Sequence, residues 1–142
     1  MSDTVQLLKE VDNGCIMAIN SMKRISDYGM SDGLAGVIDH YREEHLKLQK
    51  KAADLLRERG SGEKEPGMMA SAMAEFTTKI KMVMREDNTQ IAKIMMNGCN
   101  MGIQSIGEQI SKYSGASKES IGLAKDLIKT EEDFMRDLKQ FL

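Results

Sequence analysis

The chain has 142 residues, of which 41% are hydrophobic and 30% charged, and its 20 basic and 22 acidic side chains leave a net charge of −2. This length fits one domain, which can bury about 68% of the unfolded chain's surface without disulfides or a structural metal. The charges are interspersed and aromatic side chains are few, with three tyrosines and three phenylalanines, so the composition argues against a nucleic-acid partner.

The sequence also indicates a compartment. The amino terminus, MSDTVQLLKEVDNG, carries acids where a secretory signal has a basic flank and an apolar run. Uninterrupted apolar stretches such as IMAI are only about four residues long, which predicts no membrane-spanning segment. Two cysteines without export signals favour a reducing environment, so we expect a cytoplasmic protein with free thiols.

Helical periodicity dominates the first half of the chain. From residue 3 to about residue 27, apolar residues recur at steps of three and four, which predicts a helix that faces the inside of a bundle. A second helix is predicted after YGMSDG and ends at RERGSG, where Gly60 is expected to cap it. The inward positions are Leu8, Val11, Cys15, Ala18, Met22 and Ile25 in the first helix, and Leu34, Ile38, Tyr41, His45, Leu48, Ala52 and Leu55 in the second.

A long connection, residues 60–87, precedes the second half and includes the helical pattern MMASAMAEFTTKIKMVM. One helix over residues 68–113 would be about 69 Å long, well beyond its partners, so we expect a break near Glu86, Asp87 and Asn88. Asp87 and Asn88 would then cap a helix over 88–113, and an uninterrupted helix is the alternative. A fourth helix follows YSGAS and is predicted to reach Leu142. Its inward positions are Ile121, Ala124, Ile128, Glu131, Met135, Leu138 and Leu142, and those of the third helix are Ala92, Met95, Cys99, Gly102 and Ile106.

A repeated phrase links the two halves. NGCIMAINSM at 13–22 and NGCNMGIQSI at 97–106 agree in one register at Asn, Gly, Cys, Met, Ile and Ser, and each following helix carries an acidic pair, EEHL or EEDF. Asn-Gly often marks a turn, but the inward positions continue through both copies. We therefore expect uninterrupted helices in which Gly14 and Gly98 allow the first and third helices to approach closely. The repeat predicts one all-α domain over 1–142, with helix pairs 3–59 and 88–142 and a partly helical crossover at 60–87.

This arrangement resembles the ferritin-like superfamily, including the rubrerythrin-like proteins, and the small-residue phrase is similar to a branch of unknown function. The resemblance implies a ferritin-like four-helix bundle with two antiparallel helix pairs and parallel second and third helices. Di-iron members place a Glu on two helices and Glu-x-x-His on the other two. Here Cys15 and Cys99 stand at the glutamate positions, and no Glu lies three residues before a His. The sequence therefore favours a protein that is not an enzyme, with no catalytic residues and an incomplete di-iron ligand set.

Four inward residues near the middle of their helices form the candidate site: Cys15, His45, Cys99 and Glu131. Two sulfurs, one nitrogen and one oxygen suit zinc or ferrous iron, which predicts a metal-binding or thiol-responsive site. Further candidate ligands are Glu44 and Glu132, whereas His40 is expected to face solvent. A metal-free reading stays open, because buried cysteines pack as small hydrophobes and a buried His and Glu can bond each other.

The alternative function is a metal-free helical interaction or structural module. Such a module would self-associate as a homodimer, or bind a partner helix through the amphipathic residues 68–84. The thirteen methionines allow three readings: core packing, a groove for an apolar partner, or cuprous-ion binding.

Overall fold

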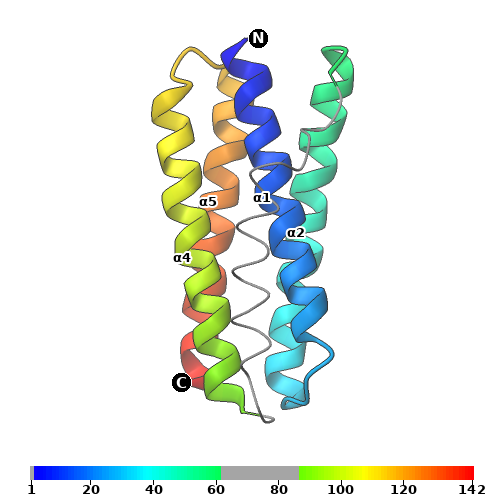
Figure 1. Cartoon of the computed structure of the whole chain (residues 1–142), viewed down its shortest axis with the longest axis vertical. Coiled ribbons are helices and arrows are strands. Elements are labelled where there is room, and N and C mark those ends of the chain that lie inside the picture. Colours follow the sequence, from blue (N-terminus) through cyan, green and yellow to red (C-terminus); the bar gives the residue numbers. More distant parts are fainter. Residues whose placement is uncertain (1, 62–86) are drawn as a thin grey trace.

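The computed structural model describes residues 2–61 and 87–142, and these residues form a bundle of four α-helices without strands (Figure 1). The helices are α1 (Asp3–Ile25), α2 (Asp32–Glu58), α4 (Asn88–Lys112) and α5 (Lys118–Leu138), followed by a short 3₁₀ turn, η1 (Lys139–Phe141). The predicted all-α four-helix bundle is confirmed. No helix in these two ranges is both long and apolar enough to cross a membrane.

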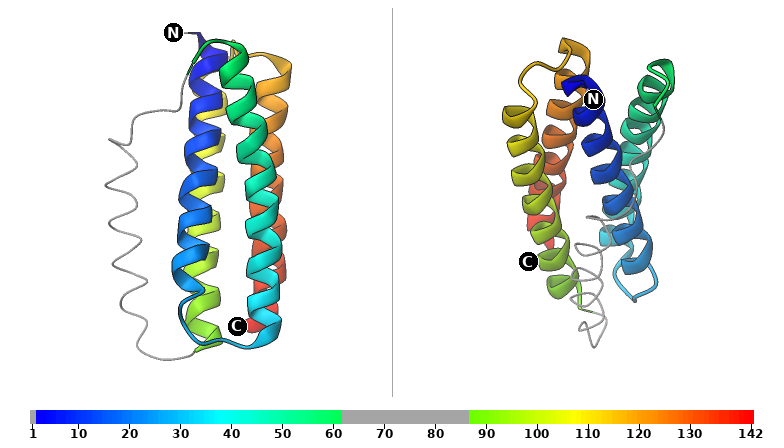
Figure 2. Two further views of the ribbon diagram at one scale, coloured as in Figure 1. Left: turned by 90° about the vertical axis from the view of Figure 1, so that its right-hand side faces the viewer. Right: turned by 45° about the horizontal axis from the view of Figure 1, so that its top comes forward.

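The order and direction of the helices also match the prediction. Figure 1 shows α1 and α5 running one way and α2 and α4 running the other way. Short connections make α1–α2 and α4–α5 antiparallel pairs, while α1 also contacts α4 and α5, and α2 contacts α5. The amino terminus and the α4–α5 loop lie at one end of the bundle, and the carboxyl terminus and the α1–α2 loop lie at the other (Figures 1 and 2).

All four helices begin at a side-chain cap. Ser2, Ser31 and Ser117 each accept a hydrogen bond from a backbone N–H in the first turn of α1, α2 and α5. Asp87, with φ −131° and ψ 103°, accepts from the N–H groups of Thr89 and Gln90. An acceptor at this position stabilises the otherwise unpaired donors of the first turn. The predicted break at Asp87 is thus confirmed, and the uninterrupted helix is wrong. The segment 68–84, predicted to bind a partner, lies outside the described residues.

The helix ends confirm one prediction and correct two others. Gly60 has φ +70°, its N–H donates to the carbonyl of Arg57, and the N–H of Ser61 donates to that of Leu56. These bonds form the glycine-capped end that was predicted for α2. The first helix ends at Ile25 rather than near residue 27. The fourth ends at Leu138 and gives way to η1, so Leu142, predicted to face inward, is 57% exposed.

The hydrophobic core consists of two clusters that occupy opposite halves of the bundle. The cluster near the amino terminus contains Val5, Leu7, Leu8, Val11, Cys15, Leu48, Ala52, Leu56, Ile106, Leu123, Ala124 and Leu127. The other contains Met22, Ile25, Leu34, Ile38, Tyr41, Ile91, Ala92, Met95, Cys99, Phe134 and Leu138. His45 and Glu131 are buried between them without belonging to either. This pair lies between two apolar halves, and one cysteine of each cluster, Cys15 and Cys99, is close enough to be acted on by the charge of Glu131. We call these four residues the polar layer.

Both ends of the bundle are held by hydrogen bonds between the two helix pairs. At one end, Asp3 Oδ2 accepts from the N–H of Gly115 at 3.0 Å, and Thr4 Oγ1 accepts from the N–H of Ser117 at 2.9 Å. At the other end, Asn88 Oδ1 accepts from the N–H of Ser31 at 3.1 Å, and Asn88 Nδ2 donates to Ser31 Oγ at 2.9 Å. Each interhelical loop is thus bonded to the first turn of a helix from the other pair.

Candidate functional site

The four predicted site residues all lie in the polar layer, and each comes from a different helix. Cys15 of α1 and His45 of α2 are 0% exposed, Cys99 of α4 is 2% exposed, and Glu131 of α5 is 5% exposed. These side chains face inward because each occupies a position three or four residues from other buried positions on its helix.

The two additional carboxylates and the second histidine do not join them. Glu44 is half-buried and forms an ion pair with Lys47 at 3.3 Å, while Glu132 is exposed. His40 is exposed, as predicted, with its ring edge-on to Tyr41. The polar layer therefore contains one carboxylate and one imidazole from the predicted set.

His45 is held by both of its ring nitrogens. Nδ1 lies 2.6 Å from the carbonyl oxygen of Tyr41, and Nε2 is hydrogen-bonded to Oε1 of Glu131. Because a carbonyl oxygen only accepts, Nδ1 carries a proton and donates it. The bond between Nε2 and Oε1 then holds one further proton, in either an imidazolium–carboxylate or an imidazole–carboxyl pair.

The electrostatics around His45 favour the charged form. Burial opposes the positive charge and is the largest single influence on its pKa. It is outweighed by the hydrogen bond and charge of Glu131, the carbonyl of Tyr41 and the charge of Glu44, so the pKa of His45 lies above its ordinary value. The surroundings of His45, on α2 and facing Glu131 of α5, thus favour its protonated form more than water does.

Both cysteines are free, buried thiols. Burial raises the pKa of Cys15, and the charges of Glu131 and Asp12 raise it further. Burial also raises the pKa of Cys99, together with the charge of Glu131 and a hydrogen bond to that carboxylate. Since a thiolate is the reactive form, these thiols are weak nucleophiles in the metal-free protein. Glu131 acts on His45 and on both thiols, which makes it the central group of the layer.

One glycine, Gly102, lies against this layer, and another, Gly14, lies against the amino-terminal cluster. A Cβ at Gly102 would be 3.6 Å from Cγ and Cδ of Glu131 and 3.7 Å from its Oε2. A Cβ at Gly14 would be 3.6 Å from Ile106 of α4, the approach predicted from the repeated phrase, and also 3.5 Å from Leu127 of α5. Both Asn-Gly pairs lie inside continuous helices, as predicted.

A second buried carboxylate lies beside the layer and was missed by the sequence analysis. Asp12 is 0% exposed, and its Oδ1 accepts from Nε2 of Gln49 at 2.9 Å, which links α1 to α2. Asp12 precedes Cys15 by three residues and Gln49 follows His45 by four. This helical spacing is the signal that could have placed both residues next to the site.

An aromatic group supports His45 from the other side. Phe134 stacks on Tyr41, with ring centroids 4.7 Å apart and planes at 14°, and its ring lies edge-on to His45 at 6.5 Å. The hydroxyl of Tyr41 donates to Oδ2 of Asp137 on α5. Tyr41 therefore has both its backbone carbonyl and its side chain engaged, which fixes the acceptor for His45.

The structure does not arrange a ready-made metal site. Over residues 2–61 and 87–142, no group of three or more His, Cys, Asp and Glu side chains could hold a metal ion as they stand. His45 Nε2 and Glu131 Oε1 bond each other directly instead. Metal binding at the layer stays a prediction.

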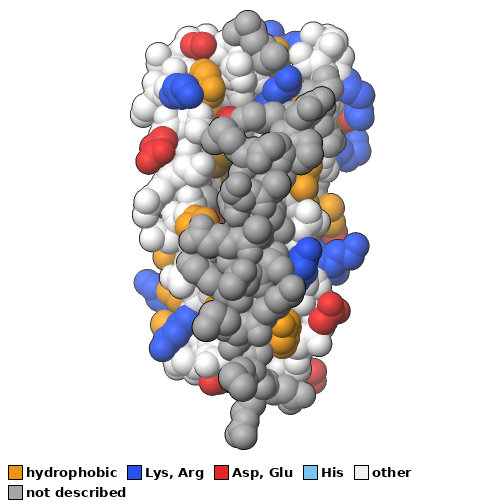
Figure 3. All heavy atoms as spheres, in the orientation of Figure 1, with side chains coloured by type: hydrophobic (Ala, Val, Ile, Leu, Met, Phe, Trp, Pro, Cys, Tyr) orange, Lys and Arg blue, Asp and Glu red, His pale blue; other side chains and the backbone are white. Residues whose placement is uncertain are grey.

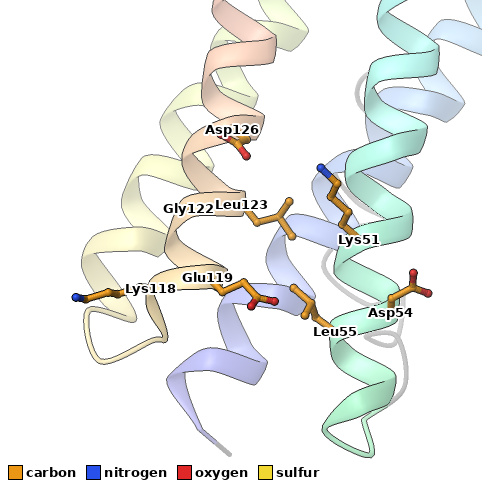
Figure 4. Close-up of a pocket in the computed structure, with 8 residues that line it drawn as sticks. All are labelled: Lys51, Asp54, Leu55, Lys118, Glu119, Gly122, Leu123 and Asp126. Carbon is orange, nitrogen blue, oxygen red and sulfur yellow. The ribbon is translucent and has the colours of Figure 1, made fainter.

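A separate hollow lies between α2 and α5, toward the α4–α5 loop (Figure 4). It has a volume of about 400 Å³ and is lined by Lys51, Asp54, Leu55, Lys118, Glu119, Gly122, Leu123 and Asp126. Its lining mixes both signs of charge. On the face shown in Figure 3, basic and acidic side chains are likewise both present beside the residues drawn in grey.

Comparisons with known proteins leave the family open, because no family model, no curated protein and no solved structure matches this chain.

Proposed function

We propose that this protein is a ferritin-like bundle whose polar layer binds one soft divalent metal ion, zinc or ferrous iron, through Cys15, His45, Cys99 and Glu131. One observation carries the proposal: four helices each contribute one buried donor, and Glu131 bonds His45 and acts on both thiols. Two thiols, an imidazole and a carboxylate are the kinds of donor that tetrahedral zinc sites use.

The topology supports the ferritin-like part of the proposal. Two antiparallel helix pairs, with α2 parallel to α4, are the arrangement expected when a single long crossover joins two hairpins. The cysteines in α1 and α4 replace carboxylates of the di-iron pattern. We therefore propose a site that binds an ion without activating oxygen.

Binding requires a rearrangement of the layer. The ion has to displace the proton between His45 and Glu131 and the protons of both thiols, because metal ligands bind in their deprotonated forms. It also has to draw in side chains that are not yet in ligand geometry. Affinity would thus depend on how much the four helices adjust around Glu131.

A second candidate is a metal-free interaction module, and the direct bond between His45 and Glu131 favours it. In that case the layer is a closed polar contact that sets helix register, and function lies on the surface. Leu46, Met101 and Leu142, which are 39%, 41% and 57% exposed, would contribute to a homodimer contact. The segment 68–84 would bind a partner helix.

Elemental analysis of protein purified anaerobically, without a metal-affinity tag, tests the first candidate. We expect about one zinc or iron per chain in the wild type, and loss of the metal in Glu131→Gln and Cys99→Ser. Glu132→Gln is the matched control, since Glu132 is the exposed neighbour and should leave the metal content unchanged. Substoichiometric metal in every preparation, together with a melting temperature that added zinc does not raise, would refute metal binding.

The second candidate is tested by light scattering on the full chain and on a chain lacking residues 68–84. Reduced mass or lost partner binding in the deleted chain, with the helical content of the bundle retained, is the expected result. An unchanged monomer in both would contradict it.

A further inference from the structure

The polar layer is not equally closed to solvent on all sides. Cys15 and His45 have no exposed surface and Cys99 is 2% exposed, whereas Glu131 is 5% exposed. Glu131 is therefore the member of the layer with the largest exposed fraction.

Gly102 presents no side chain of its own to Glu131. Oε1 of Glu131 points to His45, while Cγ, Cδ and Oε2 line the place where a Cβ on Gly102 would lie, at 3.6 to 3.7 Å. These are ordinary contact distances, so a methyl group would fit there and cover the carboxylate. Gly102 itself is only half-buried and lies one helical turn from Cys99, which also faces Glu131.

We propose that the α4–α5 contact at Gly102 is the route by which a small ligand reaches the polar layer, over Oε2 of Glu131 and on to Cys99. The route admits small soft cations and small thiol-directed electrophiles and excludes bulky ones. The identity of the natural ligand rests on the proposed function, whereas the route itself does not.

Gly107 provides a matched comparison on the same helix. It lies five residues further along α4, and a Cβ there would have no atom of residues 2–61 or 87–142 within 4 Å. A side chain at Gly107 changes helix propensity as one at Gly102 does, without covering Glu131. The pair thus separates an effect on access from an effect on the helix.

The test is the rate at which Cys99 is modified by methyl methanethiosulfonate. The thiolate sulfur attacks the reagent, a methyl disulfide forms, and methanesulfinate leaves, so the product is read by mass spectrometry of the peptide that contains Cys99. Since exchange rates depend on access, we expect at least about a threefold slower reaction in Gly102→Ala and about a tenfold slower one in Gly102→Val. Gly107→Ala and Gly107→Val should react within about twofold of the wild type.

If Cys99 is instead labelled only when the protein transiently unfolds, the four variants should give a different pattern of rates. Gly→Ala stabilises either helical position alike, so both alanine variants would then slow labelling equally, and this result would overturn the proposal. Urea unfolding of the four glycine variants shows whether a change in the free energy of unfolding accounts for a change in labelling rate. The rate of each reagent with Cys99 of the wild type is divided by its rate with free cysteine. This ratio should be much smaller for the bulky anionic 5,5′-dithiobis(2-nitrobenzoate) than for methyl methanethiosulfonate, and equal ratios would also overturn the proposal.

The outcome is independent of whether metal binds. Slowed labelling in the Gly102 variants, with no zinc bound by the wild type, supports the route and refutes the proposed function. Stoichiometric zinc in the wild type, with labelling rates unaltered in the Gly102 variants, supports the proposed function and refutes the route.

Discussion

Removing one member of the buried pair should destabilise the bundle far more than removing both. In Glu131→Met, His45 keeps its bond to the Tyr41 carbonyl but loses its charged partner at a position with no solvent exposure. Leaving one ion of a buried pair uncompensated costs about 3 to 5 kcal/mol. That is a large part of the roughly 5 to 15 kcal/mol by which domains of this kind are stable.

The double variant His45→Leu, Glu131→Met replaces the pair by apolar groups of similar size. Such exchanges are neutral or stabilise by about 1 to 4 kcal/mol, because the desolvation cost of the pair disappears. The polar layer would become continuous with the hydrophobic clusters on either side. We therefore expect the double variant to be more stable than either single variant by about 3 kcal/mol or more.

Equilibrium urea unfolding, followed by circular dichroism of the helices, measures these differences in the metal-free protein. If the free energy of unfolding falls with urea concentration at a similar slope in all variants, each exposes a similar amount of surface on unfolding. The control is Glu132→Met at the exposed neighbouring position, which should change stability by no more than about 0.5 kcal/mol. A double variant no more stable than the single ones, or a Glu131→Met cost below about 1 kcal/mol, would refute the reasoning.

Three further predictions follow from the described residues. Because the pKa of His45 is raised, the folded protein holds a proton that the unfolded chain loses as pH rises. The stability that the pair contributes should be fully present below pH 6.5, the ordinary pKa, and should be lost as pH rises through the pKa of the folded state. Urea unfolding over a pH series, compared with the double variant, checks this sign. Gly60→Ala, just beyond the end of α2, should cost about 1 to 2 kcal/mol, because a φ of +70° strains any side chain. Gly36→Ala, inside α2, should instead stabilise the protein by up to about 1 kcal/mol. Equal losses of melting temperature in both variants would contradict this. Asp87→Ala should cost about 0.5 to 2 kcal/mol through loss of the α4 cap, and Asp87→Asn should restore most of the loss in the same assay.

The inward residues could be predicted because a helix turns by a fixed angle per residue. Once apolar residues mark one face, the same steps of three and four place Cys15, His45, Cys99 and Glu131 on it, and all four are buried. The short loops likewise determine which helices pair. The long connection could be divided at Asp87 because a helix continuing through it would have been longer than its partners.

Other features depend on the number of neighbours that a helix has. A single apolar face assumes contact from one direction, but α1 contacts α2, α4 and α5, so Asp12 and Asn13 beside that face are buried as well. The bond between His45 and Glu131 depends on the relative height of two helices, which periodicity leaves undetermined. Periodicity also continues past the point where a helix ends, which is why Leu142 was placed inside although α5 stops at Leu138.

The hydrogen bonds that join each loop to the opposite helix pair have a consequence for how the chain could be divided. Asp3 and Thr4 hold the α4–α5 loop, Asn88 bonds to Ser31 at the other end, and the polar layer lies between them. A slide of one hairpin along the other by one turn, about 5.4 Å, would break all three contacts at once. The relative height of the hairpins is therefore encoded within 2–61 and 87–142 themselves. Expressed as two separate polypeptides, these halves should recognise each other and assemble in a single register.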